Sequence, residues 1–306
     1  MSDFTPYFGW IPPKERTPRQ WTAHFESRQK MPKFSIIGGT DEEPEKVDLT
    51  DLWSHPDTVS ALGYAYPGVR QSSGCCVGAG GGNAIFTLAA IEVIRVRDPE
   101  QILVPFWLLP YGRSRFYAGM TSPGDGSLGS TFARAAKEDG VVEAKREGLP
   151  GFDNQDGLSW GERVEVSWSD GDAAQTIKLL PDSRKHLIQT VSSLQRVDDV
   201  EQSIRNLYPV TIACSLIPAP KIVEEGFAFG RVARGGGHQT TLLGVQSHPK
   251  YGLVFKYVNQ WGLRWGYNGT CWIPASDVTS MIRDGEECYA FSQYQGFPAQ
   301  TFSLFL

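Results

Sequence analysis

Two adjacent cysteines are the residues of this sequence best suited to covalent chemistry. Cys75 and Cys76 follow a polar, glycine-bearing loop and precede a segment, residues 85–94, that is apolar on nearly every side. A helix that is apolar all round is a buried helix, and free N–H groups at its first turn stabilise a thiolate. A buried cysteine is more often only a small hydrophobic residue, so the assignment needs partners elsewhere. The glycines at 78, 80, 81 and 82 indicate that another element packs closely against this helix.

A candidate base and a candidate orienting group lie in the second half of the chain. His238 follows three glycines, which allow a backbone or a substrate to come close. The other histidines lie among polar or turn residues and are expected on the surface: His24, His55, His186 and His248. Asn259 opens a segment rich in tryptophan and glycine. An asparagine amide can accept the Nδ1 proton of a histidine, and an indole such as that of Trp261 can cover the bond.

Composition restricts the class of protein. The chain has 306 residues, 41% of them apolar and 21% charged, as in a globular protein of one large or two small domains. A net charge of −5 without a basic cluster argues against nucleic acid as a partner. No apolar stretch looks long enough to span a bilayer, so no membrane partner is expected. Five cysteines suggest no disulfide framework, and no signal-peptide pattern is present, which together predict a cytoplasmic protein.

The order of predicted elements indicates an α+β protein. Residues 1–46, rich in proline and aromatic residues, are expected to form an extended arm on its own domain or on another subunit. A helical part is expected at about 70–150 and a β-rich part at about 155–296. The sequences VEVSW and QTIKLL are predicted to form a hairpin, and later strands are predicted at about 209–215, 239–246, 252–259, 270–273 and 287–294. Residues 297–306 form an apolar C-terminal tail.

These features together resemble the papain-like cysteine peptidases. The segment 259–269, N-x-W-G-x-x-W-G-x-N-G, matches the asparagine motif of that family at every defining position. Gly237-His238 resembles the histidine segment, and Gly74-Cys75-Cys76 resembles the nucleophile turn. The resemblance covers roughly residues 47–295, with the three motifs in the family's order.

The resemblance implies a papain-like two-lobed fold over residues 47–296. One lobe would be helical around a central buried helix, and the other would be an antiparallel, barrel-like β lobe. The implied activity is that of a cysteine-type endopeptidase, with Cys76 as nucleophile, His238 as base and Asn259 as the orienting group. Cys75 remains the rival nucleophile. No cofactor is implied, and no metal site is expected, because the remaining cysteines lack ligand spacing.

The resemblance also assigns supporting roles to residues around the cleft. It implies that Gln71 and the Cys76 N–H stabilise the oxyanion, and that Ser127, Leu128, Gly129 and Gly237 contact a peptide substrate. Trp261 would shield the His238–Asn259 bond, and Trp265 would line the leaving-group side. Gln71 lies five residues before Cys76, where the family has six, so the oxyanion assignment stays open.

Two alternatives remain at this stage. One is a structural or assembly protein with a papain-like fold, such as a virus or phage particle component, whose arm and tail would join subunits into a homo- or hetero-oligomer; its location would then be the virion. The other transfers the acyl group to an amine or a hydroxyl instead of water. Residues 1–46 are too short and too proline-rich for the family's inhibitory propeptide, so none is expected, and regulation stays open.

Overall fold

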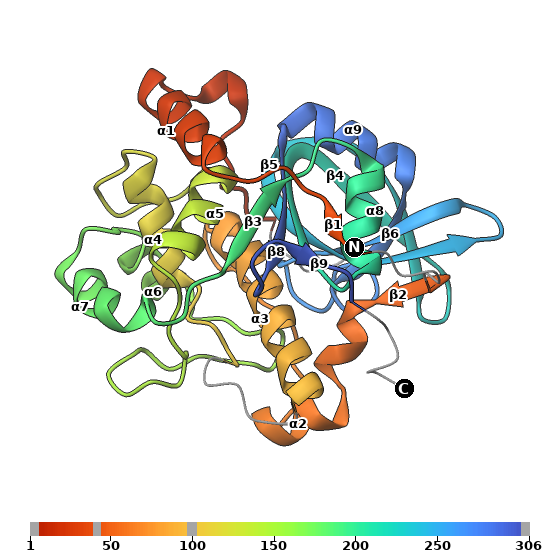
Figure 1. Cartoon of the computed structure of the whole chain (residues 1–306), viewed down its shortest axis with the longest axis horizontal. Helices are drawn as coiled ribbons and strands as arrows, with labels where there is room; N and C mark the ends of the chain where they lie inside the picture. The colour runs from red at the N-terminus through yellow and green to blue at the C-terminus, as the bar shows by residue number, and fades with distance from the viewer. Residues whose placement is uncertain (1–5, 39–43, 97–102, 301–306) are drawn as a thin grey trace.

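The computed structural model describes residues 6–38, 44–96 and 103–300, which form a helical lobe and a β lobe side by side (Figure 1). The α+β organisation predicted from the sequence is confirmed. In the helical lobe, the long helix α3 lies beside α4 and α5, with smaller helices around them. Their bounds are η2 Leu49–Trp53, α2 Pro56–Leu62, α3 Cys76–Val96, α4 Leu108–Tyr117, α5 Gly129–Glu138, α6 Glu162–Ser167 and α7 Ala174–Ser183.

The β lobe is built on a curled, mainly antiparallel sheet. Within the described residues this sheet has seven strands, in the order β3-β8-β4-β5-β6-β7, with β2 paired to β5. The strands are β2 Lys46–Asp48, β3 Thr190–Ser193, β4 Val210–Glu224, β5 Phe227–His248, β6 Gly252–Val258, β7 Thr270–Pro274 and β8 Glu287–Ser292. Strand β5 also meets β7 through Phe229 and Trp272, which bends the sheet toward a half-barrel. Helices α8 (Val197–Arg205) and α9 (Ala275–Gly285) pack on it.

Helix α3 forms the centre of the molecule, as predicted. A Cβ at Gly81 would lie 1.9 Å from the ring of Phe132, and one at Gly82 would lie 2.6 Å from that of Trp107. The expected close packing is therefore confirmed. The statement that no stretch could span a bilayer was wrong by length and composition, because Cys76–Arg95 passes such a test. However, 94% of its apolar window is buried inside this fold, where it packs as a core helix.

Two sequence-based assignments of secondary structure were wrong. VEVSW and QTIKLL lie in α6 and α7 rather than in strands. In α7 the buried positions are Thr176, Leu179, Leu180 and Ser183, which is helical spacing. A short alternation of apolar and polar residues fits both periods, so the pattern alone could not decide. The later predicted strands all overlap strands of the sheet.

The N-terminal region is not extended throughout. After η1 (Pro13–Glu15), helix α1 spans Pro18–Gln29; Thr17 caps it, and the proline stands at its first position, where a missing N–H costs nothing. The region contacts its own chain: α1 packs on α5, and β1 (Ile36–Ile37) pairs with β9 (Phe297–Pro298). Of the two expectations for this region, the structure of the single chain shows the first: the region packs on its own domain. Tail residues 301–306 lie outside the described residues.

Candidate active site

The predicted nucleophile stands where the two lobes meet. Cys76 is the first residue of α3 and is fully buried. Its Sγ accepts a hydrogen bond from the backbone N–H of Gln239, the residue after His238, at 3.4 Å. The N-terminal end of the central helix is thus brought to the middle of strand β5. This juxtaposition joins the first two motifs, which are 162 positions apart along the chain.

The third motif is joined to the second by a hydrogen bond. His238 Nε2 lies 2.9 Å from Asn259 Oδ1, because β5 and β6 are adjacent strands and Asn259 follows the end of β6. The amide oxygen also accepts the N–H of Gln260 at 2.8 Å, which fixes its orientation. An oxygen facing the ring requires Nε2 to carry the proton, so the expectation that Nδ1 would donate was wrong. Nδ1 is then the basic nitrogen, and it has no hydrogen-bond partner in the described part of the chain.

Two tryptophans enclose the histidine–asparagine pair. The ring centroid of Trp261 lies 4.9 Å from that of His238, at an interplanar angle of 35°. Trp265 packs edge-on against Trp261 at 6.3 Å and is 1% exposed. Trp261 therefore lies over the ring that makes the hydrogen bond, whereas Trp265 packs behind that indole. An indole over the ring keeps water from the hydrogen bond.

The rival cysteine points elsewhere. Cys75 Sγ donates to Glu165 Oε2 at 3.1 Å, on the side of helix α6. Burial, and next the negative charge of Glu165, raise the pKa of the Cys75 thiol well above its usual value. This thiol is held as a protonated donor. The geometry therefore favours Cys76 over Cys75 as the nucleophile.

Gln71 reaches into the cleft in spite of its shorter spacing from Cys76. Its Nε2 donates to the carbonyl of Ser73 at 2.8 Å and to that of Tyr7 at 3.4 Å. The carbonyl of Tyr7 also accepts the indole N–H of Trp261 at 3.1 Å. The side-chain amide of Gln71 and the indole N–H of Trp261 thus donate to the same carbonyl oxygen, that of Tyr7.

An N-terminal segment, irregular at first and ending in η1, lies over the candidate site. Residues 7–16, here called the strap, run between the lobes, and Trp10 pairs with Ser127 in parallel register. Ser127 donates to Gly9 O at 2.8 Å, and the N–H groups of Gly9 and Trp10 reach Gly237 O at 3.0 and 3.1 Å. Ser127 and Gly237, both proposed from the resemblance to contact substrate, therefore bind a segment of the protein's own chain. Of the other two candidates, Leu128 precedes α5 as its N-cap, and Gly129 donates to Glu287.

The strap covers the candidate reactive groups, a contact that the composition of residues 1–46 did not predict. The ring of Phe8 stands edge-on to His238 at 6.3 Å and to Trp261 at 5.7 Å. Gly9 lies so close to the nucleophile loop that an added Cβ would be 1.7 Å from Gly74 O. The Phe-Gly-Trp sequence at residues 8–10 makes these contacts, but composition alone did not show which surface it packs on.

Burial under the strap changes the titration of both groups. Burial raises the pKa of Cys76 to about 12, although N–H groups of Gln239, Gly9 and Trp10 oppose it. Burial lowers the pKa of His238 to about 4, against the bond to Asn259. The pair is therefore a neutral thiol and a neutral imidazole while the cleft is covered. Exposure of the cleft to water would remove the dominant cause of both shifts.

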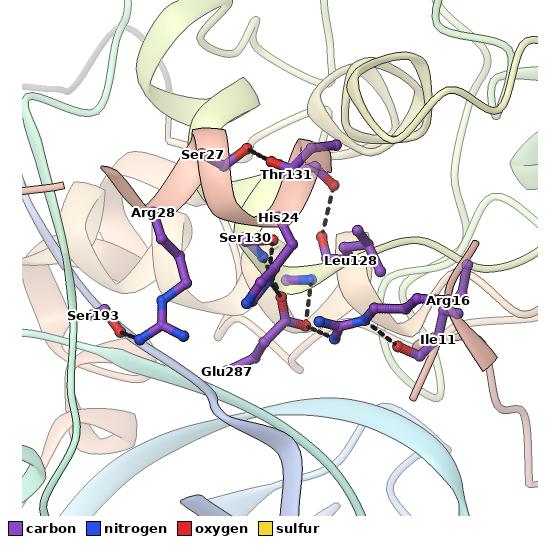
Figure 2. A network of polar contacts seen from close by, with 12 residues as sticks. Ile11, Arg16, His24, Ser27, Arg28, Leu128, Ser130, Thr131, Ser193 and Glu287 are labelled. Carbon is purple, nitrogen blue, oxygen red and sulfur yellow. Dashed lines mark hydrogen bonds and ion pairs between the residues drawn. The ribbon is translucent and has the colours of Figure 1, made fainter. Parts of the chain in front are cut away.

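A buried carboxylate that sequence reasoning missed anchors the strap (Figure 2). Glu287 Oε2 lies 3.1 Å from the guanidinium of Arg16 and accepts the indole N–H of Trp10. Its Oε1 lies 2.9 Å from Nδ1 of His24, which is buried, so the expectation that this histidine lies on the surface was wrong. Two N–H groups at the start of α5 also donate to the carboxylate. Burial alone would raise the pKa of Glu287, but Arg16, His24 and Trp10 hold it well below its usual range.

No metal site accompanies these groups among the described residues, where no cluster of three or more His, Cys, Asp or Glu could hold an ion. The cysteines at 214, 271 and 288 are buried and are not in disulfides.

The lobes, the central helix and the half-barrel define a papain-like α+β fold. Among solved structures, the chain is similar to xylellain, a cysteine protease from Xylella fastidiosa, with a TM-score of 0.59 and 17% identity over 95% of this chain and 98% of that one. It is also similar to procathepsin B S9 from Trypanosoma congolense (TM-score 0.54, 12% identity, 88% and 87% covered). A third similar structure is the proform of the ragweed pollen cysteine protease Amb a 11 (TM-score 0.51, 15% identity, 92% and 74% covered). No family model and no curated protein matches the sequence.

Proposed function

We propose that this protein is a cysteine-type peptidase that hydrolyses peptide bonds through an acyl-enzyme. The observation that carries the proposal is the hydrogen bond from His238 Nε2 to Asn259, which leaves Nδ1 unprotonated beside the strand segment that contacts Cys76. The fold is one shared with cysteine proteases, which supports the same chemistry. A peptide or protein is the substrate, as the extended chain bound in the cleft suggests.

In the proposed reaction, Nδ1 of His238 takes the thiol proton of Cys76, and the thiolate attacks the substrate carbonyl carbon. The backbone N–H of Cys76 and Nε2 of Gln71 stabilise the oxyanion. The imidazolium then protonates the leaving amine, and a thioester forms on Cys76. Water, deprotonated by His238, attacks the thioester and releases the acid and the free thiol. Asn259 holds the ring in one tautomer throughout.

The contacts of the strap support a resting state in which the active site is covered, and they do not argue against peptidase activity. It presents N–H groups of Gly9 and Trp10 near the sulfur, and both are also held by Gly237 O. Its parallel pairing with Ser127 satisfies the same backbone groups that a substrate would need. Turnover therefore requires residues 7–16 to leave the cleft. The alternative of an assembly protein has less support from the N-terminal region, because that region packs on its own chain.

A peptidyl electrophile tests the proposal. Labelling of the full chain, mapped by mass spectrometry, is expected at Cys76 and is expected to vanish in Cys76→Ala but not in Cys75→Ala. Peptide cleavage should follow the same pattern. Labelling that persists in Cys76→Ala, or cleavage unaffected by that change, would refute the assignment. Amine acceptors added to the assay would reveal acyl transfer as a competing product.

A further inference from the structure

A second buried carboxylate lies behind the nucleophile loop and has no part in the mechanism above. Glu165, on α6, is 0% exposed. Its Oε2 accepts three hydrogen bonds: from the N–H of Ser72 at 2.8 Å, from Ser73 Oγ at 2.9 Å and from Cys75 Sγ at 3.1 Å. All three donors belong to the loop, residues 71–75, that leads into Cys76. One oxygen of one side chain therefore holds most of this loop.

The hydrogen-bond donors that stabilise the buried carboxylate of Glu165 all come from this loop. Within residues 6–38, 44–96 and 103–300, Glu165 has no ion pair, and its Oε1 has no hydrogen-bond partner. A buried, unpaired carboxylate costs several kcal/mol unless donors surround it. The donors from the loop supply that compensation, so the loop and the side chain fix each other. Loss of the acceptor would leave three buried donors unsatisfied.

The same loop places two groups of the proposed reaction. Gln71 is its first residue, held by its N–H on Gln260 O at 2.9 Å, and Gly74 N–H is held by Asp125 Oδ1 at 2.9 Å. The segment between these two ties is fastened by Glu165. The loop also carries the competing thiol of Cys75, which Glu165 turns toward α6. Its conformation thus decides both where Gln71 points and which sulfur faces the cleft.

We propose that Glu165 is a positioning residue: it fixes the nucleophile loop so that Gln71 reaches the oxyanion, and it holds Cys75 out of the cleft. The first part rests on the proposed peptidase function, whereas the second concerns the cysteine pair itself. Glutamine at this position keeps an acceptor oxygen for the three donors, with its NH2 group on the side where Oε1 has no partner. Leucine has a similar size but no acceptor.

The test compares Glu165→Leu, Glu165→Gln and, as a matched control, Glu162→Gln on the exposed side of the same helix. Alkylation of Cys75 by N-ethylmaleimide, followed by peptide mapping in a Cys76→Ala chain, needs no peptidase activity. The alkylation rate of Cys75 should increase about tenfold or more in Glu165→Leu, because the loss of a charge-assisted hydrogen bond frees the thiol. In Glu165→Gln and Glu162→Gln the alkylation rate should stay at that of the parent. Peptide turnover is measured in the full chain, with and without Arg16→Ala to loosen the strap. Glu165→Leu should lower kcat about 100-fold with KM within about twofold, as for a misplaced oxyanion donor, and glutamine should restore kcat.

The results separate the two proposals. A folded leucine variant with parent kcat and an unreactive Cys75 overturns the inference. So does a folded glutamine variant that loses kcat or exposes Cys75, which keeps the test valid if leucine prevents folding. Thermal unfolding identifies folded variants. If no chain cleaves peptide while Cys75 still responds to leucine as expected, the peptidase function fails and the role toward Cys75 stands. If activity depends on Cys76 but not on Glu165, the inference alone fails.

Discussion

Replacing Arg16 by alanine is expected to release the strap from the cleft. The guanidinium lies 3.1 Å from Glu287, and the two side chains are 1% and 0% exposed. Removing one partner of a buried ion pair costs about 3–5 kcal/mol. His24 still contacts the other oxygen of Glu287 in the variant, so the carboxylate keeps one partner. We therefore take the low end of this range, about 3 kcal/mol, as the cost of the substitution. Arg16 also ties Ile11 O at 3.1 Å, and this bond is lost too. The cost falls on the covered state, because in the open state the guanidinium is hydrated.

A change of about 3 kcal/mol raises the ratio of open to covered molecules about 100-fold. The second-order rate of Cys76 labelling by a peptidyl electrophile reports this ratio while the covered state dominates. It should therefore rise about 100-fold in Arg16→Ala. Lys14→Ala is the matched control, since Lys14 is exposed in the same segment. A rate in Arg16→Ala within about twofold of the control, with the protein folded, would show that the ion pair does not hold the strap.

Three further predictions concern the same cleft. Gly9→Ala should also speed Cys76 labelling, because its Cβ would lie 1.7 Å from Gly74 O and the strap must move away; an unchanged rate would contradict the observed path of the strap. Asn259→Ala removes the acceptor 2.9 Å from His238 Nε2 and should lower kcat on the order of 100-fold at similar KM; a kcat within a few-fold of the parent would show that the ring is oriented by other groups. The pKa of His238 is lowered from 6.5 to about 4, so the unfolded chain binds this proton first as pH falls. Stability should thus fall by about 3 kcal/mol between pH 6.5 and 4 through this group, as measured by denaturant unfolding, and His238→Gln should remove that part of the slope.

The fold was predictable because the three motifs together resemble those of the papain-like family, and each motif also has a physical reason of its own. An all-round apolar helix must be buried, and a cysteine at its start meets the helix dipole. The asparagine segment contains the tryptophan that shields the bond to His238. These are local relations that a single sequence displays. The tautomer was not predictable, because it depends on the N–H of Gln260 fixing the amide of Asn259.

The contacts between distant segments could not be predicted in the same way. Glu287 and Glu165 look like ordinary charged residues in the sequence, and only the fold buries them against the strap and the nucleophile loop. The composition of the strap was visible in the sequence, but the surface on which the strap packs was not. Helix α1 was missed because a count of prolines ignored that Pro18 stands at the first helical position, where it favours a helix.

The path of the strap has a consequence for the order of assembly during synthesis. Residues 7–16 leave the ribosome long before the residues that enclose them, since Gly237, Trp261 and Glu287 come more than 200 positions later. The strap must therefore stay in solvent until both lobes have been synthesised and folded. Docking of the strap on the active site is thus a late step of folding. Each newly made molecule passes through an uncovered form before the strap reaches its place.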